Sequence, residues 1–201
     1  MRNTQVVLEN VRLSYVHLTK PYAAQPGQDE KYSVTILLPK TDTAGKAKLD
    51  AAIEAAKDWG REKKWGGQVP PICPTPIHDG DGVKQDGTEF GPECKGMWVM
   101  TASSKADQPV EVVDRNLNRI LDPTQIYSGM YANVCVNVYP YVYVAKKGIG
   151  FGLGPVQKTA DGESFGGGAP TAASVFSAMG GGENTQGTAA PRINPLTGQP
   201  M

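Results

Sequence analysis

Cysteines, histidines and long apolar runs are scarce in this sequence of 201 residues. The three cysteines are an odd set, which does not make a disulfide framework and is typical of a reducing cytoplasm. No apolar run approaches the ~20 residues of a membrane-spanning helix, and the N-terminus lacks the layout of a signal peptide. The two histidines, His17 and His78, are accompanied by no serine in a nucleophile-elbow pattern, so we expect no enzyme.

An excess of positive charge is also missing, because 20 lysine and arginine residues are matched by 20 aspartate and glutamate residues. A protein that binds nucleic-acid phosphates usually has a strong basic excess. The C-terminal segment does not mask such an excess, since residues 158–201 hold two basic and three acidic residues. Any basic surface on this protein must therefore be local.

Period-two alternation, the pattern of a strand with one buried face, is most regular over residues 131–148. The valines there share one face, which we predict to fill the core, and they are Val134, Val136, Val138, Val142 and Val144. Residues 5–18 alternate similarly but change phase near Glu9–Asn10, as a β-bulge would. Further strands are predicted over residues 31–39, 97–104 and 110–116. Residues 148–154 are strand-like, and their glycines leave one face bare so that another backbone or ligand can approach.

One helix is predicted over residues 41–65, with N-cap candidates at Thr41, Asp42 and Thr43. Its apolar stripe is narrow and consists of Leu49, Ala52, Ile53 and Ala56. Such a helix suits one side or one end of a barrel. Five strands, one covering helix and long loops together predict a small closed or partly closed β-barrel.

Two segments lack a regular pattern. Residues 66–95 hold six glycines and five prolines, which indicates a functional or mobile loop. Residues 160–201 are rich in glycine, alanine and proline and, apart from residues 172–179, offer little to bury. We therefore expect a disordered tail there.

The second face of the strand at 131–148 carries Tyr139, Tyr141 and Tyr143, and Lys146 and Lys147 follow. Alternate residues of a strand lie about 6.6 Å apart, close to the spacing of splayed bases, and rings so placed can stack on bases without reading sequence. Basic residues on or just beyond other strands are candidates for phosphate contacts, namely Arg12, Lys31, Lys105 and Arg115. Outward tyrosines equally fit packing under a loop or across a dimer interface.

Pro140 interrupts the backbone donors of this strand, so it requires an edge position or a bulge. A bent edge there would tip the tyrosines away from the barrel wall.

Two constellations could hold a metal ion. Asp79 and Asp81 in HDGDG are two residues apart, as in Ca²⁺ loops, but no glutamate follows at the EF-hand distance and a glycine turn explains them as well. Cys73, His78 and Cys94 offer three zinc ligands without a Cys-x-x-Cys pair or a fourth ligand. We therefore predict no metal and no cofactor.

Five segments in this order resemble the bacteriophage single-stranded-DNA-binding proteins of the OB-fold type, at residues 11–23, 32–40, 112–116, 127–141 and 148–167. The resemblance implies a mainly β protein, with an OB-fold-like five-stranded barrel and one covering helix over residues 1–159 and a tail at 160–201. It also implies coating of single-stranded DNA during phage replication and recombination, without catalysis. The predicted helix departs from the usual OB order, because it follows the second strand and not the third.

The leading hypothesis is a sequence-nonspecific single-stranded-DNA-binding protein, with the tyrosines and basic residues above as its site and Tyr15 and Trp98 as weaker stacking candidates. Its expected partners are single-stranded DNA, further copies of itself as a homodimer or higher oligomer, and phage or host replication proteins, in the cytoplasm of the infected bacterial host. The alternative is a phage structural or assembly protein whose tyrosine face is a protein–protein interface. A metal-dependent nuclease acting through Asp79 and Asp81 is a third hypothesis.

Overall fold

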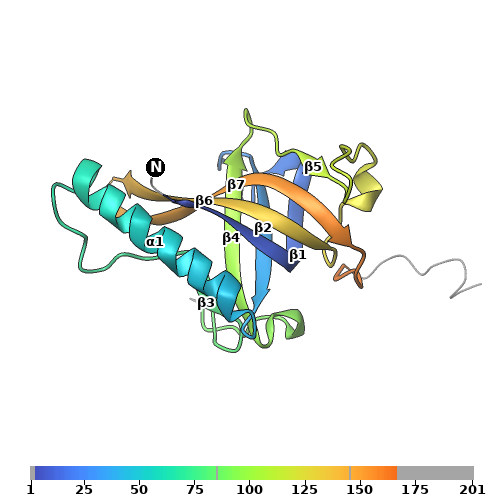
Figure 1. Ribbon diagram of the computed structural model, residues 1–201, viewed down its shortest axis with the longest axis horizontal. Helices are drawn as coiled ribbons and strands as arrows, with labels where there is room; N and C mark the ends of the chain where they lie inside the picture. Colours follow the sequence, from blue (N-terminus) through green and yellow to red (C-terminus); the bar gives the residue numbers. More distant parts are fainter. Residues whose placement is uncertain (1–2, 85, 145, 167–201) are drawn as a thin grey trace, which may run out of the picture. The chain divides into compact units, whose positions relative to one another are not determined.

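The computed structural model describes residues 3–84, 86–144 and 146–166, and these form a closed five-stranded barrel with one long helix against it (Figure 1). The barrel strands are β1 (Gln5–Tyr22), β2 (Lys31–Pro39), β4 (Met97–Lys105), β6 (Tyr131–Tyr143) and β7 (Lys146–Ala160). Their antiparallel order is β4-β2-β1-β6-β7, and a parallel bridge between Ser103 and Gly152 joins β4 to β7 and closes the ring. The structure thus confirms the predicted OB-like barrel.

Two short strands and two short 3₁₀ helices complete the described elements. β3 (Ile77–Asp79) extends the sheet beyond β4, and β5 (Val112–Val113) pairs in parallel with β7. The 3₁₀ helices span Pro92–Cys94 and Pro123–Gln125. The loop predicted at residues 66–95 therefore holds one three-residue strand and one 3₁₀ turn.

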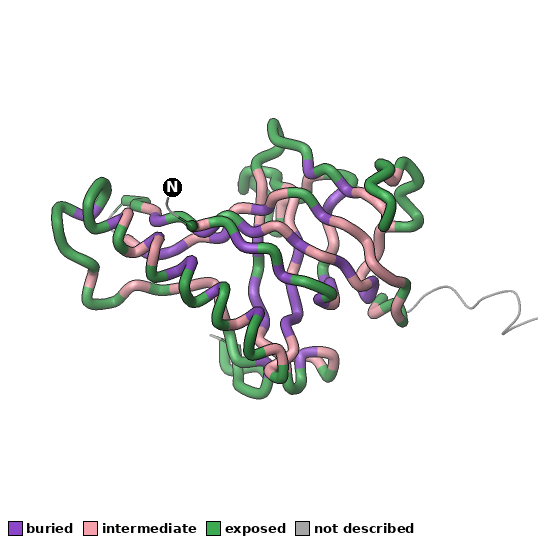
Figure 2. Tube along the Cα trace, viewed as in Figure 1, coloured by how far each residue is buried: buried purple, intermediate pink, exposed green. Residues whose placement is uncertain are grey.

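Residues that alternate along the barrel strands fill its interior, as Figure 2 shows by the buried positions along each strand. In β6 these are Ala132, Val134, Val136 and Val138, and the same alternation buries Pro140 against α1 beyond the barrel. The phase change predicted near Glu9–Asn10 is a bulge, because the register with β6 shifts between Leu8 and Val11. A second bulge, which the alternation did not predict, shifts the register with β2 between Ser14 and His17.

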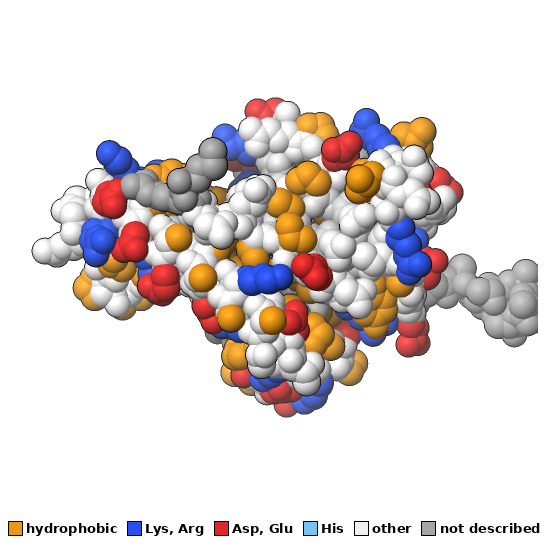
Figure 3. All heavy atoms as spheres, in the orientation of Figure 1, with side chains coloured by type: hydrophobic (Ala, Val, Ile, Leu, Met, Phe, Trp, Pro, Cys, Tyr) orange, Lys and Arg blue, Asp and Glu red, His pale blue; other side chains and the backbone are white. Residues whose placement is uncertain are grey.

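The helix α1 (Thr43–Lys63) follows the second barrel strand, as predicted. Asp42 is its N-cap, since its carboxylate accepts the Gly45 backbone N–H at 2.8 Å. The predicted stripe is buried, and α1 lays it against β6 and β1. The opposite side pairs charges at helical spacing, such as Lys46 with Asp50, so basic and acidic groups are interspersed over the face in Figure 3.

The predicted strand at residues 110–116 is wrong in extent. Only Val112 and Val113 are strand, because the Asp114 carboxylate then accepts the backbone N–H groups of Asn116 and Asn118 and turns the chain. The fifth barrel strand is β7, which extends the strand-like pattern of residues 148–154 in both directions.

The prediction that Val142 and Val144 fill the core is also wrong, since they are 47% and 89% exposed. The ladder between β1 and β6 ends at the pair Gln5–Asn137. Beyond it, β6 and β7 continue as a hairpin beside the C-terminal end of α1 (Figure 1), so the valines near its tip meet no interior.

Pro140 lies in this outer part of β6, where an edge position was expected. The Val138 N–H donates to Thr4 on the β1 side, so the Pro140 nitrogen faces the same edge two residues on, past the end of the β1 ladder. The ring is buried, and the alternation continues through it to Tyr141. Proline thus costs no ladder hydrogen bond and closes this edge to further strand pairing.

Residues 161–166, which the sequence assigns to the tail, pack against β1 and the loop before β6 through Arg12 and Tyr127. The rest of the predicted tail, including residues 172–179, lies outside the described residues. Within those described, α1 and the shorter helices all fall short of the length and apolar character that a bilayer crossing requires.

Candidate functional site

The barrel surface formed by β2 and β4 changes character along its length. Residues that point outward pair across the two strands as Leu37 with Val99, Thr35 with Thr101, Ser33 with Ser103, and Lys31 with Lys105. The first pair is covered by Phe90, Cys94, Met97 and Phe165, which form a small second core. The other three pairs leave a strip of small hydroxyl side chains that ends in two ammonium groups. We call these six residues, from Thr35 and Thr101 to Lys31 and Lys105, the outer β2–β4 face.

Two cavities adjoin the lysine end of this face. One, of about 540 Å³, is lined by Lys31, Ser103, Lys105 and Tyr139, and the other, of about 570 Å³, by Lys31, Ser103, Tyr22 and Tyr143. The structure therefore brings Tyr139, Tyr143, Lys31 and Lys105 together, although they come from three different strands. Acidic side chains reach the first cavity as well, namely Asp29, Glu30 and Asp107. The positive charge at this end of the face therefore comes from the two lysine ammonium groups, and acidic side chains lie around them.

The three tyrosines of β6 do not present equal surfaces. Tyr139 is 38% exposed and lies over the bare face of β7, where a Cβ added to Gly150 would lie 2.6 Å from its Cζ. Tyr141 is half-buried, with its hydroxyl over Gly148. Tyr143 is 73% exposed. Burial raises the pKa of Tyr139, and Tyr141 adds a smaller effect, so the Tyr139 phenol is neutral at physiological pH.

The sequence predicted that the glycines of residues 148–154 would leave a bare face for another backbone or ligand to approach. The structure shows that the occupant of this face is the tyrosine row itself, because Tyr139 pairs with Gly150 and Tyr141 with Gly148 across the strands.

Lys146 and Lys147 begin β7, beside the tyrosines. Lys146 pairs with Tyr143 and Lys147 with Val142 at the end of the hairpin. Lys146 thus extends the surface around Tyr143 away from the barrel, whereas Lys147 lies on the opposite face of the hairpin with Val142.

The remaining predicted residues lie elsewhere. Arg115 donates a hydrogen bond to the Thr159 carbonyl oxygen, about 30 Å along β7 from Gly150. Trp98 lies at the opposite end of β4 from Lys105, with Lys40 and Lys46 over its ring at 5.1 and 5.2 Å.

Arg12 of β1 pairs with Leu37, at the other end of β2 from Lys31, and Tyr15 lies in the bulge opposite Ser33–Thr35. The Arg12 guanidinium donates to the carbonyl oxygens of Gly129 and Glu163 and lies 4.2 Å over the Phe165 ring. Tyr15 is 68% exposed beside a separate cavity.

The aspartates of HDGDG hold a turn together. The Lys40 ammonium bonds both Asp79 and Asp81, and the Asp81 carboxylate also accepts the Gly96 N–H at 2.9 Å. The Lys40 hydrogen bonds are the main cause that lowers the pKa of both carboxyls, and the same bonds raise the pKa of Lys40. Lys40 occupies the position in which a cation would have to bind.

The candidate zinc ligands belong to different clusters. Cys73 packs against the main core, whereas Cys94 is buried in the second core with Leu37 and Val99. Burial is the main cause that raises the pKa of both thiols, which disfavours the thiolate that zinc requires. Over the described part of the chain, no group of three or more acidic, histidine or cysteine side chains is placed to hold a metal ion.

Sequence reasoning missed several residues of this surface. Ser33, Thr35, Thr101 and Ser103 were visible as small polar residues alternating with core residues, but only the register of β2 with β4 shows that they form one strip. The stacked rings of His17 and Tyr22, with centroids 4.4 Å apart, adjoin the lysine end and gave no sequence signal.

Comparisons with solved structures agree with this architecture. The single-stranded-DNA-binding protein from bacteriophage Enc34 in complex with ssDNA is 32% identical, with a TM-score of 0.69 over 82% of this chain and 91% of that chain. Another structure of the Enc34 protein is 30% identical, with a TM-score of 0.65 over 88% and 92% of the two chains. The gp2.5 protein of bacteriophage T7 is 16% identical over 88% and 97%, with a TM-score of 0.51, and shares the fold alone.

No curated protein matches the chain in sequence. A family model described as "Enterobacter phage Enc34, ssDNA-binding protein" matches residues 4–186. The match spans nearly the whole chain, including every strand of the barrel. The chain therefore belongs to the single-stranded-DNA-binding protein family of Enterobacter phage Enc34.

Proposed function

We propose that this protein binds single-stranded DNA without sequence specificity, on the outer β2–β4 face and the adjoining β6–β7 hairpin. The observation that carries the proposal is the pair Lys31–Lys105, which ends a strip of small hydroxyl residues beside Tyr139 and Tyr143. The family assignment supports it, because the related Enc34 protein is described in complex with ssDNA.

The contacts divide by chemistry. Lys31 and Lys105 contact phosphates at the barrel, Lys146 extends these contacts along the hairpin on the face of Tyr143, and Lys147 adds a positive charge on its other face. Tyr143 stacks on a base with most of its ring, and Tyr139 offers the ring face that does not cover Gly150. The small side chains of the face let the DNA backbone approach the sheet closely. Stacking and phosphate contacts do not read base identity, so binding tolerates any sequence.

The biological role follows from the family. We infer that the protein coats single-stranded DNA during phage replication, recombination or repair, in the cytoplasm of the infected host, and that it does so without catalysis. We assign the phosphate contacts and the stacking on the β6 tyrosines to residues 1–159, and contacts with replication proteins or further copies of the chain to surfaces outside the outer β2–β4 face.

Titration of the intrinsic tyrosine and tryptophan fluorescence with oligo-dT at two salt concentrations tests the proposal. Two to four phosphate contacts predict a log–log slope of roughly −1.4 to −2.8, since each contact on a single strand contributes about −0.7. Absence of quenching and of salt-sensitive binding at micromolar protein would refute it.

The alternative, a phage structural or assembly protein, has one observation in its favour. Val142, Tyr143 and Val144 are all exposed at the hairpin tip, as an interface between protein chains would require. This alternative predicts an oligomer that neither salt nor oligonucleotide changes. Gel filtration with and without oligo-dT separates the two functions.

A further inference from the structure

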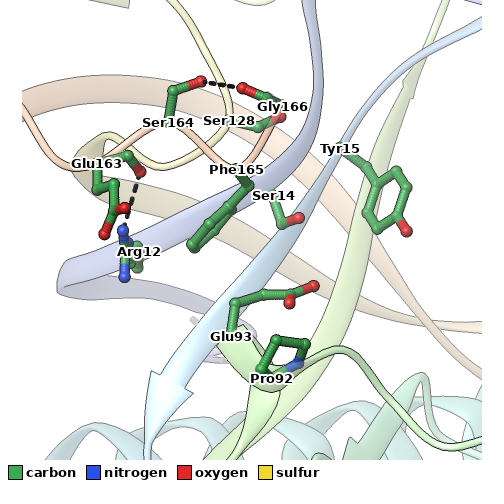
Figure 4. Close-up of a pocket in the computed structure, with 10 residues that line it drawn as sticks. All are labelled: Arg12, Ser14, Tyr15, Pro92, Glu93, Ser128, Glu163, Ser164, Phe165 and Gly166. Atoms are coloured by element: carbon green, nitrogen blue, oxygen red, sulfur yellow. Dashed lines mark hydrogen bonds between the residues drawn. The ribbon is translucent and has the colours of Figure 1, made fainter. Parts of the chain in front are cut away.

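A further cavity, of about 600 Å³ and with no lysine in its lining, lies on the barrel surface (Figure 4). Its walls come from β1, from the 3₁₀ helix Pro92–Cys94, from Ser128 and from residues 163–166. Ser14, which forms part of the cavity, pairs with Thr35 of the outer β2–β4 face. Thr35 lies four residues from Lys31, so the cavity is about 13 Å along the strand from the proposed phosphate site.

Tyr15 is placed at this cavity by strained backbone. It occupies the second bulge of β1 with φ of 46°, a region that tyrosine rarely adopts. The bulge turns the ring outward beside the buried Ser14, and Tyr15 is 68% exposed. Strain of this kind persists where the surrounding structure enforces it, and it often marks a functional position.

Phe165 provides a second ring, which is anchored from three sides. Its N–H donates to the Ser128 carbonyl oxygen, Arg12 lies over its face, and its ring packs on the second core. Figure 4 shows Phe165 and Tyr15 on either side of Ser14, with Glu93 and Pro92 on a further wall.

The charges of the cavity disfavour a phosphate. Glu93 and Glu163 are both lining residues, and the guanidinium of the single basic residue, Arg12, already donates to two backbone carbonyl oxygens. Two aromatic rings, three serine hydroxyls and two carboxylate acceptors instead match an uncharged, planar ring with amino donors.

We propose that this cavity is a nucleobase subsite, in which Tyr15 and Phe165 contact the base and the Glu93 carboxylate accepts a hydrogen bond from an exocyclic amino group. Adenine, cytosine and guanine carry that group, whereas thymine does not. The subsite rests on the proposed DNA binding and deepens it, because it adds a preference at one position to an otherwise sequence-tolerant interface. The spacing of 13 Å places it about two nucleotides from the phosphate contacted by Lys31.

A scan with 2-aminopurine tests the subsite in the full-length protein. A single 2-aminopurine is moved through an oligo-dT of 12 nucleotides, and its fluorescence is recorded with and without protein. We expect one position to change far more than the others, and replacement of that base by thymine or an abasic site to weaken binding about 5- to 100-fold. Equal signals and equal affinities at every position would overturn the subsite while leaving DNA binding intact. If no oligonucleotide binds at all, the proposed function fails as well.

Three variants attribute the effect to named side chains. Tyr15→Asn removes the ring but places a residue that tolerates positive φ, so its thermal midpoint should not fall while the single-position signal is lost. Phe165→Leu keeps the apolar packing and should weaken the same position. Glu93→Ala should abolish the preference for an amino-bearing base over thymine.

Lys31→Gln is the matched control, and it should weaken all oligonucleotides alike. A positional signal that survives both Tyr15→Asn and Phe165→Leu would contradict the assignment.

Discussion

Lys31 lies directly opposite Lys105 in the antiparallel ladder of β2 and β4. Like charges in this position oppose folding by a few tenths of a kcal/mol to about 1 kcal/mol, and a bound phosphate would reverse the effect. We therefore expect Lys31→Gln and Lys105→Gln each to raise or leave unchanged the free energy of unfolding, and to make the salt slope of oligo-dT binding shallower by about 0.7. Urea denaturation and fluorescence titration measure the two effects.

Arg115→Gln is the control for these variants, because Arg115 lies at the far end of β7 and contacts the Thr159 carbonyl oxygen. Its salt slope should equal that of the parent protein. A shallower slope for Arg115→Gln alone would move the phosphate contacts away from the outer β2–β4 face.

Tyr143 and Tyr141 of β6 should have different roles, because Tyr143 is the more exposed of the two. Tyr143→Ala should weaken oligo-dT binding by about 5- to 100-fold, as the loss of one stacked base predicts, and should change the free energy of unfolding by less than about 0.5 kcal/mol. Tyr141→Ala should do the reverse, because Tyr141 covers Gly148 and supports the hairpin. The affinity for oligo-dT and the urea midpoint are measured for both variants. Equal losses of affinity would show that exposure does not determine which tyrosine stacks on a base.

Gly60 should resist replacement although it lies in a helix. A Cβ there would lie 2.7 Å from the Trp65 ring and 2.8 Å from the Cβ of Pro140. Helix propensity alone favours Gly60→Ala by about 1 kcal/mol, whereas overpacking costs about 1–3 kcal/mol, so we expect a net loss of stability. Asp58→Ala, on the exposed side of α1, should change the urea midpoint little. Stabilisation by Gly60→Ala would show that Trp65 is free to move aside.

Replacement of Lys40 should lower the stability of the protein by an amount that depends on pH. The pKa values of Asp79 and Asp81 are lowered from 3.8, so their contribution is complete at neutral pH and is lost as the pH falls through the folded values below 3.8. Lys40→Met should therefore lower the thermal midpoint at pH 7, and the gap to the parent protein should narrow by pH 3.

Lys48→Met, which removes a 3.5 Å pair with Glu9, is the control for Lys40→Met and should have little effect at either pH. A gap for Lys40→Met that is equal at pH 7 and pH 3 would mean that Lys40 acts by packing on Trp98 and not by charge.

Local sequence patterns predicted the elements in which the spacing of apolar residues shows by itself which side is buried. The stripe from Leu49 to Ala56 and the cap at Asp42 predicted α1, and the alternation of Val134, Val136 and Val138 predicted a barrel strand. The extents of the strands at residues 110–116 and 146–160 were harder to predict. Residues 110–116 alternate like a strand but form one only at Val112 and Val113, and glycines interrupt the apolar pattern of residues 146–160. Tyr139 and Tyr141 cover that glycine face from the neighbouring strand, and a pairing of this kind is invisible in either segment alone.

The sequence by itself determined the barrel class, the covering helix, the absence of a disulfide framework and the family resemblance, because periodicity, capping and composition are local properties. The tertiary structure alone decided where β1 ends, and hence that Val142 and Val144 leave the core. It also decided that Lys31 meets Lys105 beside Tyr139, that Lys40 neutralises Asp79 and Asp81, and that Arg12 holds Phe165. Such relationships depend on strand register between distant segments, which a single residue of slip would undo.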